Sequence, residues 1–373
     1  MTEKLFFLIK FTLTNIVFAL CLFSCLKRLN KTKEHATAEL LLFSLGAAPA
    51  FVSLLLYYAF LCLPPLANFF YFGFISAAFA ILMWLGRKEI PTNFKFILIS
   101  LFPIWHKIKS GKFVSSLFPE NGADRNKKLS ARLFILFCLL IAIYLGLSFI
   151  SVLQMPAAGH DAVEYAAQGK ALLKTRHIEL RNQLLDPDTG VYQPSFHAPG
   201  FSLLITWEIL MNNLFGFRED LYLRSIAFYY GLLILGLQFY WLNKKNKWLA
   251  LLGLLGLLST PFFHSALIHI HIDTYRIYFL ITSWIYLARA VEKPNRLSLI
   301  LLGIACGFSA YAHILGAVMS IFTIFTFLLF VKGYFIDKLK YACRVAVFAL
   351  ATGGIHYVID LFWGNGWIIN IHI

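Results

Sequence analysis

Charged residues are scarce in this chain of 373 residues, where Asp, Glu, Lys and Arg together make up 14% of the sequence. Soluble domains carry about 25% of such residues, so the low share excludes a water-soluble globule. Hydrophobic residues instead make up 60% of the sequence, and its mean hydropathy is +0.73. The composition therefore indicates an integral membrane protein.

Acidic residues are scarcer than basic ones, 18 against 33, which gives a net charge of +15. In a soluble protein this balance would suggest a nucleic-acid partner. Here no basic-aromatic nucleic-acid module is present, and 24 of the 33 basic residues fall in five loops: 27–38, 87–132, 243–247, 289–296 and 332–344. Such a bias is typical of cytoplasmic loops, so the charge predicts membrane orientation and no nucleic-acid partner.

Common catalytic and metal-binding motifs are also lacking. The sequence has no GxSxG, no P-loop, no HExxH and no CxxC. Its six cysteines fall in or beside apolar segments: Cys21, Cys25, Cys62, Cys138, Cys306 and Cys343. We therefore expect neither a structural disulfide nor a thiolate metal site.

Long apolar segments dominate what is present, and each is long enough to approach or cross a hydrocarbon core of roughly 30 Å as a helix. The alternating pattern of an outer-membrane barrel is absent. The sequence thus predicts an all-α polytopic bundle of about ten spans. These are 5–26, 39–62, 69–86, 133–154, 223–242, 247–267, 276–291, 296–312, 314–332 and 345–361.

Two polar regions are longer than turns. In the loop 87–132, the apolar stretch 94–105 is followed by lysines, which favours a helix lying on an anionic leaflet over a solvated linker. The region 155–222 is expected to face outward and to form two amphipathic helices near the membrane surface.

The acidic motif "GHDAVEY" opens that outward region directly after an apolar span. Asp161 and Glu164 are three residues apart, so on a helix they share a face, with Tyr165 beside Asp161. A carboxylate at headgroup level is placed to accept a proton from a hydroxyl or to hold a divalent cation beside a phosphate. The same spacing also suits a helix-capping box, and by itself it favours the cap.

A second polar island, "HSALIHIHIDTYR", is expected on the same side of the membrane. His269 and His271 alternate with isoleucine, and Asp273 follows, which is compatible with a metal or phosphate site. Interfacial histidines without a ligand, and Arg276 as the salt-bridge partner of Asp273, are the plainer alternatives. His197 and Arg224 are weaker candidates, Arg224 either meeting a phosphate or anchoring its helix.

Four segments in this order resemble the GT-C superfamily of membrane glycosyltransferases. They are "GHDAVEYAAQGKALLKTRHI", "FHAPGFSLLITWEILMNNLFGFREDLYLRSIAFYYGLLIL", "HIDTYRIYFLITSWIYLAR" and "RLSLILLGIACGFSAYAHILGAVM". The likeness is narrower to the bacterial group of protein O-mannosyltransferases, aminoarabinose transferases and Rhizobium lipopolysaccharide core transferases. The matching elements are Asp161 with Glu164 and Tyr165, Pro199-Gly200-Phe201, Leu214-Phe215-Gly216, Arg224-Ser225 and Asp273.

The resemblance implies an inverting glycosyltransferase of the cytoplasmic membrane of a bacterium, with its site facing outward. A polyprenyl-phosphate-linked sugar would be the donor, and a lipid, glycan or protein the acceptor. Asp161 would be the base or the carboxylate that positions the acceptor, and Glu164 and Asp273 would shape the acceptor or metal site. Arg224, Arg276 or His271 would neutralise the phosphate, with His269, Tyr165 and His197 also binding substrate. Because some relatives need a metal and others do not, a divalent cation, Mg²⁺ or Mn²⁺, on Asp161 and Asp273 stays open.

The chain also departs from the family pattern. Residues 1–130 form a three-span extension with a basic loop before the transferase-like core, 131–361, and a tail, 362–373, follows. Ala198 replaces the first proline of the usual pair. A transporter or flippase, which favours buried charges and broken helices, and a truncated, non-catalytic membrane assembly protein remain as alternatives.

Overall fold

A computed structural model describes residues 2–30, 35–93, 125–154, 160–176, 178, 198–214 and 223–363. Within these ranges it gives only the backbone course for 2–11, 125–132, 153–154, 160–162, 212–214 and 360–363. The surface helix predicted at 94–105, as well as His197, therefore lies outside the described residues.

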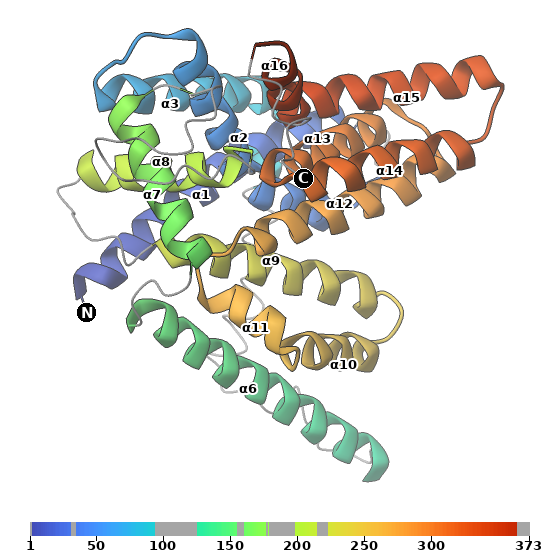
Figure 1. Ribbon diagram of the computed structural model, residues 1–373. Helices are drawn as coiled ribbons and strands as arrows, with labels where there is room; N and C mark the ends of the chain where they lie inside the picture. Colours follow the sequence, from blue (N-terminus) through green and yellow to red (C-terminus); the bar gives the residue numbers. More distant parts are fainter. Residues whose placement is uncertain are drawn as a thin grey trace, which may run out of the picture.

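The described residues form helices and no strand (Figure 1). The elements are α1 (Thr2–Leu29), α2 (Thr37–Cys62), α3 (Asn68–Gly86), α6 (Arg125–Gln154), α7 (His160–Thr175), α8 (Gly200–Leu214), α9 (Arg224–Asn243), α10 (Lys247–Leu258), α11 (Pro261–Ile268), α12 (Ile272–Glu292), α13 (Arg296–Ala312), α14 (Ile314–Phe330), α15 (Phe335–Ala349), η2 (Leu350–Gly354) and α16 (Ile355–Trp363).

Six helical segments of the described chain are long and apolar enough to cross a membrane, which is consistent with a multi-pass membrane protein. They are Thr12–Leu29, Thr37–Cys62, Asn68–Gly86, Leu133–Val152, Arg224–Asn243 and Phe335–Ile359. The pair α10 and α11 makes a seventh if its two helices are counted as one bent span. All ten predicted segments are helical, but α13 and α14 have only 17 residues each, and α12 is not among the six.

Two of the predicted segments differ in shape from the expectation. The span predicted at 247–267 is broken by a bend of 74° between α10 and α11. Pro261 is the first residue of α11, and a proline cannot donate the backbone hydrogen bond that would continue α10. The last span begins earlier than predicted, at Phe335, and Asp337 and Lys340 in its first turns pair along one helical face at 3.6 Å.

The helices α9 and α12 lie side by side and run in the same direction. Near their starts the rings of Tyr230 and Tyr275 are 4.9 Å apart, and near their ends Arg289 lies 5.3 Å from the ring of Trp241. We call the end of the bundle at which both helices begin the Arg224 end. The opposite end, where α2 begins and α12 ends, is the Glu39 end.

Loops predicted to be cytoplasmic meet at the Glu39 end. Arg289 bonds to Glu39, and His35 contacts Ser298, so the loops 27–38 and 289–296 are neighbours. The turn between α9 and α10 lies on the same side of the molecule, at the right in Figure 1. Three of the five basic loops that the sequence assigns to one side of the membrane, 27–38, 243–247 and 289–296, therefore share one end of the bundle in their described residues.

The helix α8 is the most enclosed of the elements in the predicted outward region. Every residue from Gly200 to Glu208 is buried, and Trp207 stacks on Phe72 of α3 and contacts Phe18 of α1. The expected amphipathic surface helix is instead a buried one, which α7 covers on one side. By contrast, α6 lies at the edge of the bundle, with only 6% of its apolar window buried (Figure 1).

Candidate functional site

Arg224 is the first residue of α9 and is only 1% exposed. None of its three guanidinium nitrogens has a hydrogen-bond partner among the described residues. Burying an unpaired charge costs several kcal/mol, and the amino end of a helix adds further positive potential at this position. The arrangement therefore favours binding of an anion by Arg224.

Two histidines lie in the extended link between α11 and α12, as their alternation with isoleucine predicts. Burial lowers the pKa of His269, and the positive charge of nearby Arg224 lowers it further. His269 is consequently neutral near pH 7, and its buried Nδ1 has no partner in the described part of the chain. A neutral imidazole beside Arg224 can exchange a hydrogen bond with a ligand without adding charge.

Asp273 lies in the first turn of α12 and is 7% exposed. Arg276 donates to its Oδ1, and the Nδ1 of His271 lies 3.0 Å from its Oδ2. Burial alone would raise the pKa of Asp273, but the hydrogen bond with His271 and the charge of Arg276 outweigh it and lower the pKa. Arg276 is thus the salt-bridge partner of Asp273, which leaves Arg224 as the better candidate for binding an anion.

His271 also shapes the start of α12. Its Nδ1 lies 3.3 Å from the backbone N–H of Asp273 and accepts that hydrogen bond when the ring is protonated only on Nε2. When the ring is charged, the same Nδ1 donates to the Asp273 carboxylate instead. His271 therefore positions Asp273 in either protonation state.

The acidic motif lies in the first turns of α7, which begins at His160. Asp161 is therefore the second residue of the helix and shares a face with Glu164, while its side chain lies outside the described residues. Tyr165 is 2% exposed and packs edge-on against Phe201 of α8 at 5.4 Å, and Phe201 lies 6.2 Å from Tyr275 of α12. These two ring contacts bring the motif to the Arg224 end, where Asp273 lies.

The Pro-Gly segment has a packing role. Ser53 of α2 donates a hydrogen bond of 2.6 Å to the carbonyl of Gly200, at the first turn of α8. A Cβ atom at Gly200 would lie 2.4 Å from the carbonyl oxygen of Tyr311 in α13. Only glycine permits this approach, which fixes α8 against α2 and α13. In the Leu214-Phe215-Gly216 segment, Leu214 ends α8, and the other two residues lie outside the described ranges.

A buried carboxyl group at Glu208 was not among the predicted site residues. Glu208 of α8 is fully buried, and its Oε1 accepts a hydrogen bond of 2.9 Å from Ser225, the neighbour of Arg224. Its Oε2 has no partner among the described residues. The signal was present in the sequence, because an acid within the apolar run "FSLLITWEIL" needs a buried partner.

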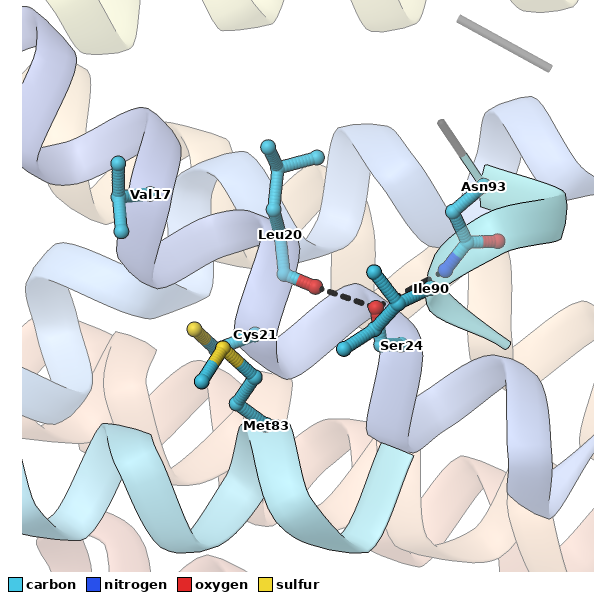
Figure 2. A pocket seen from close by; sticks show the side chains of 7 residues that line it. All are labelled: Val17, Leu20, Cys21, Ser24, Met83, Ile90 and Asn93. Carbon is cyan, nitrogen blue, oxygen red and sulfur yellow. Dashed lines mark hydrogen bonds between the residues drawn. The ribbon is translucent and has the colours of Figure 1, made fainter. Parts of the chain in front are cut away.

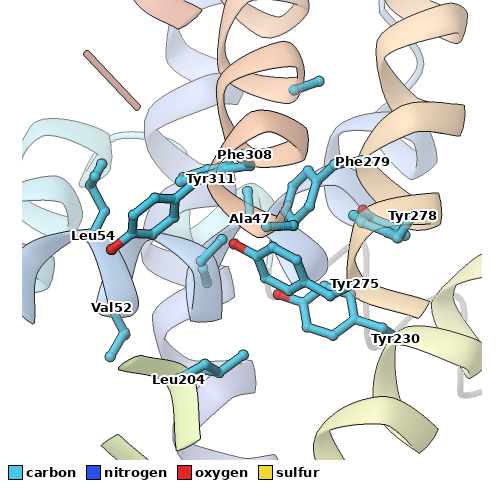
Figure 3. Close-up of a cluster of buried hydrophobic side chains, with 14 of the residues drawn as sticks. Ala47, Val52, Leu54, Leu204, Tyr230, Tyr275, Tyr278, Phe279, Phe308 and Tyr311 are labelled. Carbon is cyan, nitrogen blue, oxygen red and sulfur yellow. The ribbon is translucent and has the colours of Figure 1, made fainter. Parts of the chain in front are cut away.

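Tyrosines fill the core beneath the Arg224 end. The rings of Tyr230 and Tyr275 pack edge-on (Figure 3). Tyr230 donates a hydrogen bond to the carbonyl of Gly46 in α2. The hydroxyl of Tyr275 is buried and has no partner in the described part of the chain. The Arg224 end thus combines several buried polar atoms that the described protein groups leave unpaired.

The described residues contain no group of three or more His, Cys, Asp or Glu side chains placed to hold a metal ion. That statement does not cover Asp161, whose side chain lies outside the described residues. A divalent cation shared by Asp161 and Asp273 therefore stays a prediction of the sequence.

Comparison with known proteins adds no relative. No family model, no curated protein and no solved structure matches this chain.

Proposed function

We propose that this protein is an inverting glycosyltransferase that takes a sugar from a polyprenyl-phosphate-linked donor on the non-cytoplasmic face of the membrane. The acceptor is a lipid, glycan or protein. The observation that carries the proposal is the buried, unpaired Arg224 at the start of α9, in the same part of the bundle as Asp273 and the acidic start of α7. A phosphate would supply the anion that Arg224 lacks.

The proposed chemistry assigns one task to each group. The acceptor hydroxyl attacks the anomeric carbon, and the bond between that carbon and the phosphate oxygen breaks. Asp161 takes the hydroxyl proton, and the polyprenyl phosphate leaves with the bonding electrons. Arg224 and the amino end of α9 stabilise the charge that develops on the leaving phosphate, while Asp273, held by His271 and Arg276, positions the acceptor.

The proposal extends to the arrangement in the membrane. We propose a core at 131–361 of GT-C type and a three-span extension at 1–130, with α12, α13 and α14 completing a bundle of about ten spans. The protein would then reside in the cytoplasmic membrane of a bacterium. The clustering of basic loops at the Glu39 end supports this orientation, because it leaves the Arg224 end facing outward.

The test is Asp161→Asn in the native membrane, scored by the surface glycan or lipid modification at matched protein level. We expect the modification to be lost. Asp337→Asn is the matched control, since Asp337 is a half-exposed carboxylate on α15 and pairs only with Lys340 among the described residues. Normal glycan in Asp161→Asn would overturn the catalytic assignment.

A lipid transporter or flippase is the second candidate, and a specific observation favours it. The 74° break between α10 and α11, together with the buried Glu208 and Arg224, resembles the broken helices and buried charges of transporters. Proteoliposomes containing a fluorescent polyprenyl-phosphate sugar separate the two functions. Movement of the lipid between leaflets without sugar transfer would replace the transferase with the flippase.

A further inference from the structure

A groove of about 200 Å³ lies between α1 and α3, far in sequence from the proposed transfer site (Figure 2). Its lining is mostly apolar and consists of Val17, Leu20, Cys21, Ser24, Met83, Ile90 and Asn93. From Val17 to Ser24 the groove follows α1 for about 10 Å at 1.5 Å per residue. That is about two thirds of one leaflet of a hydrocarbon core roughly 30 Å thick.

The groove is closed at one end by a polar contact. Asn93 donates a hydrogen bond of 2.9 Å to Ser24 (Figure 2). Lys27 donates one of 2.8 Å to Asn93. The opposite end, at Val17, is apolar and exposed. The groove therefore has the polarity of a lipid, with an apolar stretch leading to a polar edge.

The polar edge carries an excess of positive charge. Lys27, Arg28, Arg87 and Lys88 lie where α1 and α3 end, and Gly86 packs directly on the backbone of Ser24 and Cys25. Among the described residues, Lys27 alone of these four cations pairs with an acid, Glu89 at 3.7 Å.

Helix ends do not cancel this excess. The carboxyl ends of α1 and α3 each contribute roughly half a negative charge. Four cations outweigh one carboxylate and the two helix ends, so the edge keeps a net charge of about +2. Arg28 donates to the Leu85 carbonyl, and Arg87 lies over the ring of Trp84, so both cations are held at this edge.

We propose that this groove binds one acyl chain of an anionic phospholipid, whose phosphate lies against the basic edge. Basic clusters at the cytoplasmic side of transmembrane helices attract anionic headgroups, and the groove offers such a headgroup an adjacent apolar path for its chain. The next segment of the chain, 94–105, is predicted from the sequence to lie on the same anionic leaflet. A second groove, between α12 and α14, encloses about 260 Å³ and, like the first, has no cation in its lining, so it serves as a control for substitutions that fill a groove.

The experiment is native mass spectrometry of the full-length protein from micelles with equal amounts of phosphatidylglycerol and phosphatidylcholine of identical chains. We expect the protein to retain phosphatidylglycerol preferentially. Met83→Trp, which fills the groove from a lipid-exposed position, should abolish that retention, whereas Met319→Trp in the second groove should not. Arg87→Gln with Lys88→Gln should lower the preference by about tenfold.

Both basic positions of the double variant are exposed, so that variant tests the headgroup without disturbing the core. Equal retention of the two lipids would overturn the proposal, since the groove would then hold any acyl chain. Retention that persists in Met83→Trp would place the lipid elsewhere and also overturn it. A spectrum with no retained lipid would also overturn the proposal. A dimer without bound lipid would show instead that the groove forms a contact between two copies of the protein.

Discussion

The two ends of the bundle differ in whether their most deeply buried ionisable side chains are paired. At the Glu39 end, the carboxylate of Glu39 is 2% exposed and lies 3.3 Å from both His35 and Arg289. His35 in turn contacts Ser298 of α13 at 3.0 Å. At the Arg224 end, the guanidinium of Arg224 and the Oε2 of Glu208 have no partner among the described residues.

From this difference we infer that the Glu39 end holds a structural network and the Arg224 end a binding site. At the Glu39 end, the polar contacts join α2, α12 and α13, so the charges serve the fold. At the Arg224 end, burial without pairing destabilises the fold unless something else completes the hydrogen bonds. A residue that costs stability and yet occupies the start of a helix is best explained by a ligand.

The largest expected effect comes from Arg224→Leu. We expect the surface modification to fall by about a hundredfold, because the leaving phosphate loses its cation. The melting temperature of the purified protein in detergent should stay level or rise, since Arg224 makes no side-chain hydrogen bond to the described residues that the change would remove. Arg289→Leu is the comparison at the other end and should lower the melting temperature, because it removes a partner of Glu39. If Arg224→Leu lowered the melting temperature as much as Arg289→Leu does, the proposed difference between the two ends would be wrong.

Glu39→Ala tests the structural end alone. It leaves Arg289 without its carboxylate and should lower the free energy of unfolding by about 2 kcal/mol, less than for a fully buried pair because the Arg289 side chain is 31% exposed. Thermal unfolding measures the change. Asp337→Ala is the control, and its exposed pair with Lys340 should contribute less than about 1 kcal/mol. If Glu39→Ala and Asp337→Ala lowered the free energy of unfolding equally, the Glu39 network would contribute no more to stability than an exposed ion pair.

Gly200→Ala tests whether α8 is held rigidly at the Arg224 end. The added methyl group would meet the Tyr311 carbonyl oxygen at 2.4 Å, and we expect a loss of about 1–3 kcal/mol in stability, measured by thermal unfolding. Gly73→Ala in α3 is the matched control, because a Cβ atom there meets nothing within 4 Å. If Gly200→Ala left the stability unchanged, α8 would be able to shift away from Tyr311 without loss of stability.

The smallest effect is expected at Asp273, whose carboxylate is already paired with Arg276 and His271. Since its pKa is lowered in the folded protein, its contribution to stability is present above about pH 3.9, the ordinary aspartate value. That contribution is lost as the pH falls through the lowered pKa. Melting curves of the wild type and Asp273→Asn should thus differ by about 1 kcal/mol at pH 7 and converge below pH 3.9. A difference that vanishes already near pH 6 would contradict the ion pair with Arg276.

The sequence predicted the helices well, because in a membrane each apolar run must satisfy its own backbone hydrogen bonds. It did not predict the break at Pro261, because apolar residues lie on both sides of this proline and the hydropathy therefore shows no interruption. It also missed the burial of α8. The helix is buried because α2, α3, α7 and α13 pack around it, and such contacts between distant segments leave no periodic signal in the sequence.

Some local arrangements in the candidate site follow from the sequence. Asp273 with Arg276, and the extended His269 and His271, are arranged as their spacing suggests. The sequence alone did not decide whether Arg224 anchors its helix or binds a ligand. The answer depends on how deeply Arg224 is buried, and burial depends on neighbouring helices that the sequence of α9 does not reveal. The contact between Glu208 and Ser225 likewise joins two helices, α8 and α9, and the pattern of either helix alone does not reveal it.

Thermal stabilisation of the purified protein by polyprenyl phosphate, compared with the uncharged polyprenol of equal length, tests the anion site of Arg224 most directly. A ligand that binds the folded state raises its stability in proportion to the logarithm of ligand concentration. We predict that polyprenyl phosphate raises the melting temperature of the wild type, that polyprenol does not, and that Arg224→Leu abolishes the effect. Equal stabilisation by both lipids, or an undiminished effect in Arg224→Leu, would contradict the account.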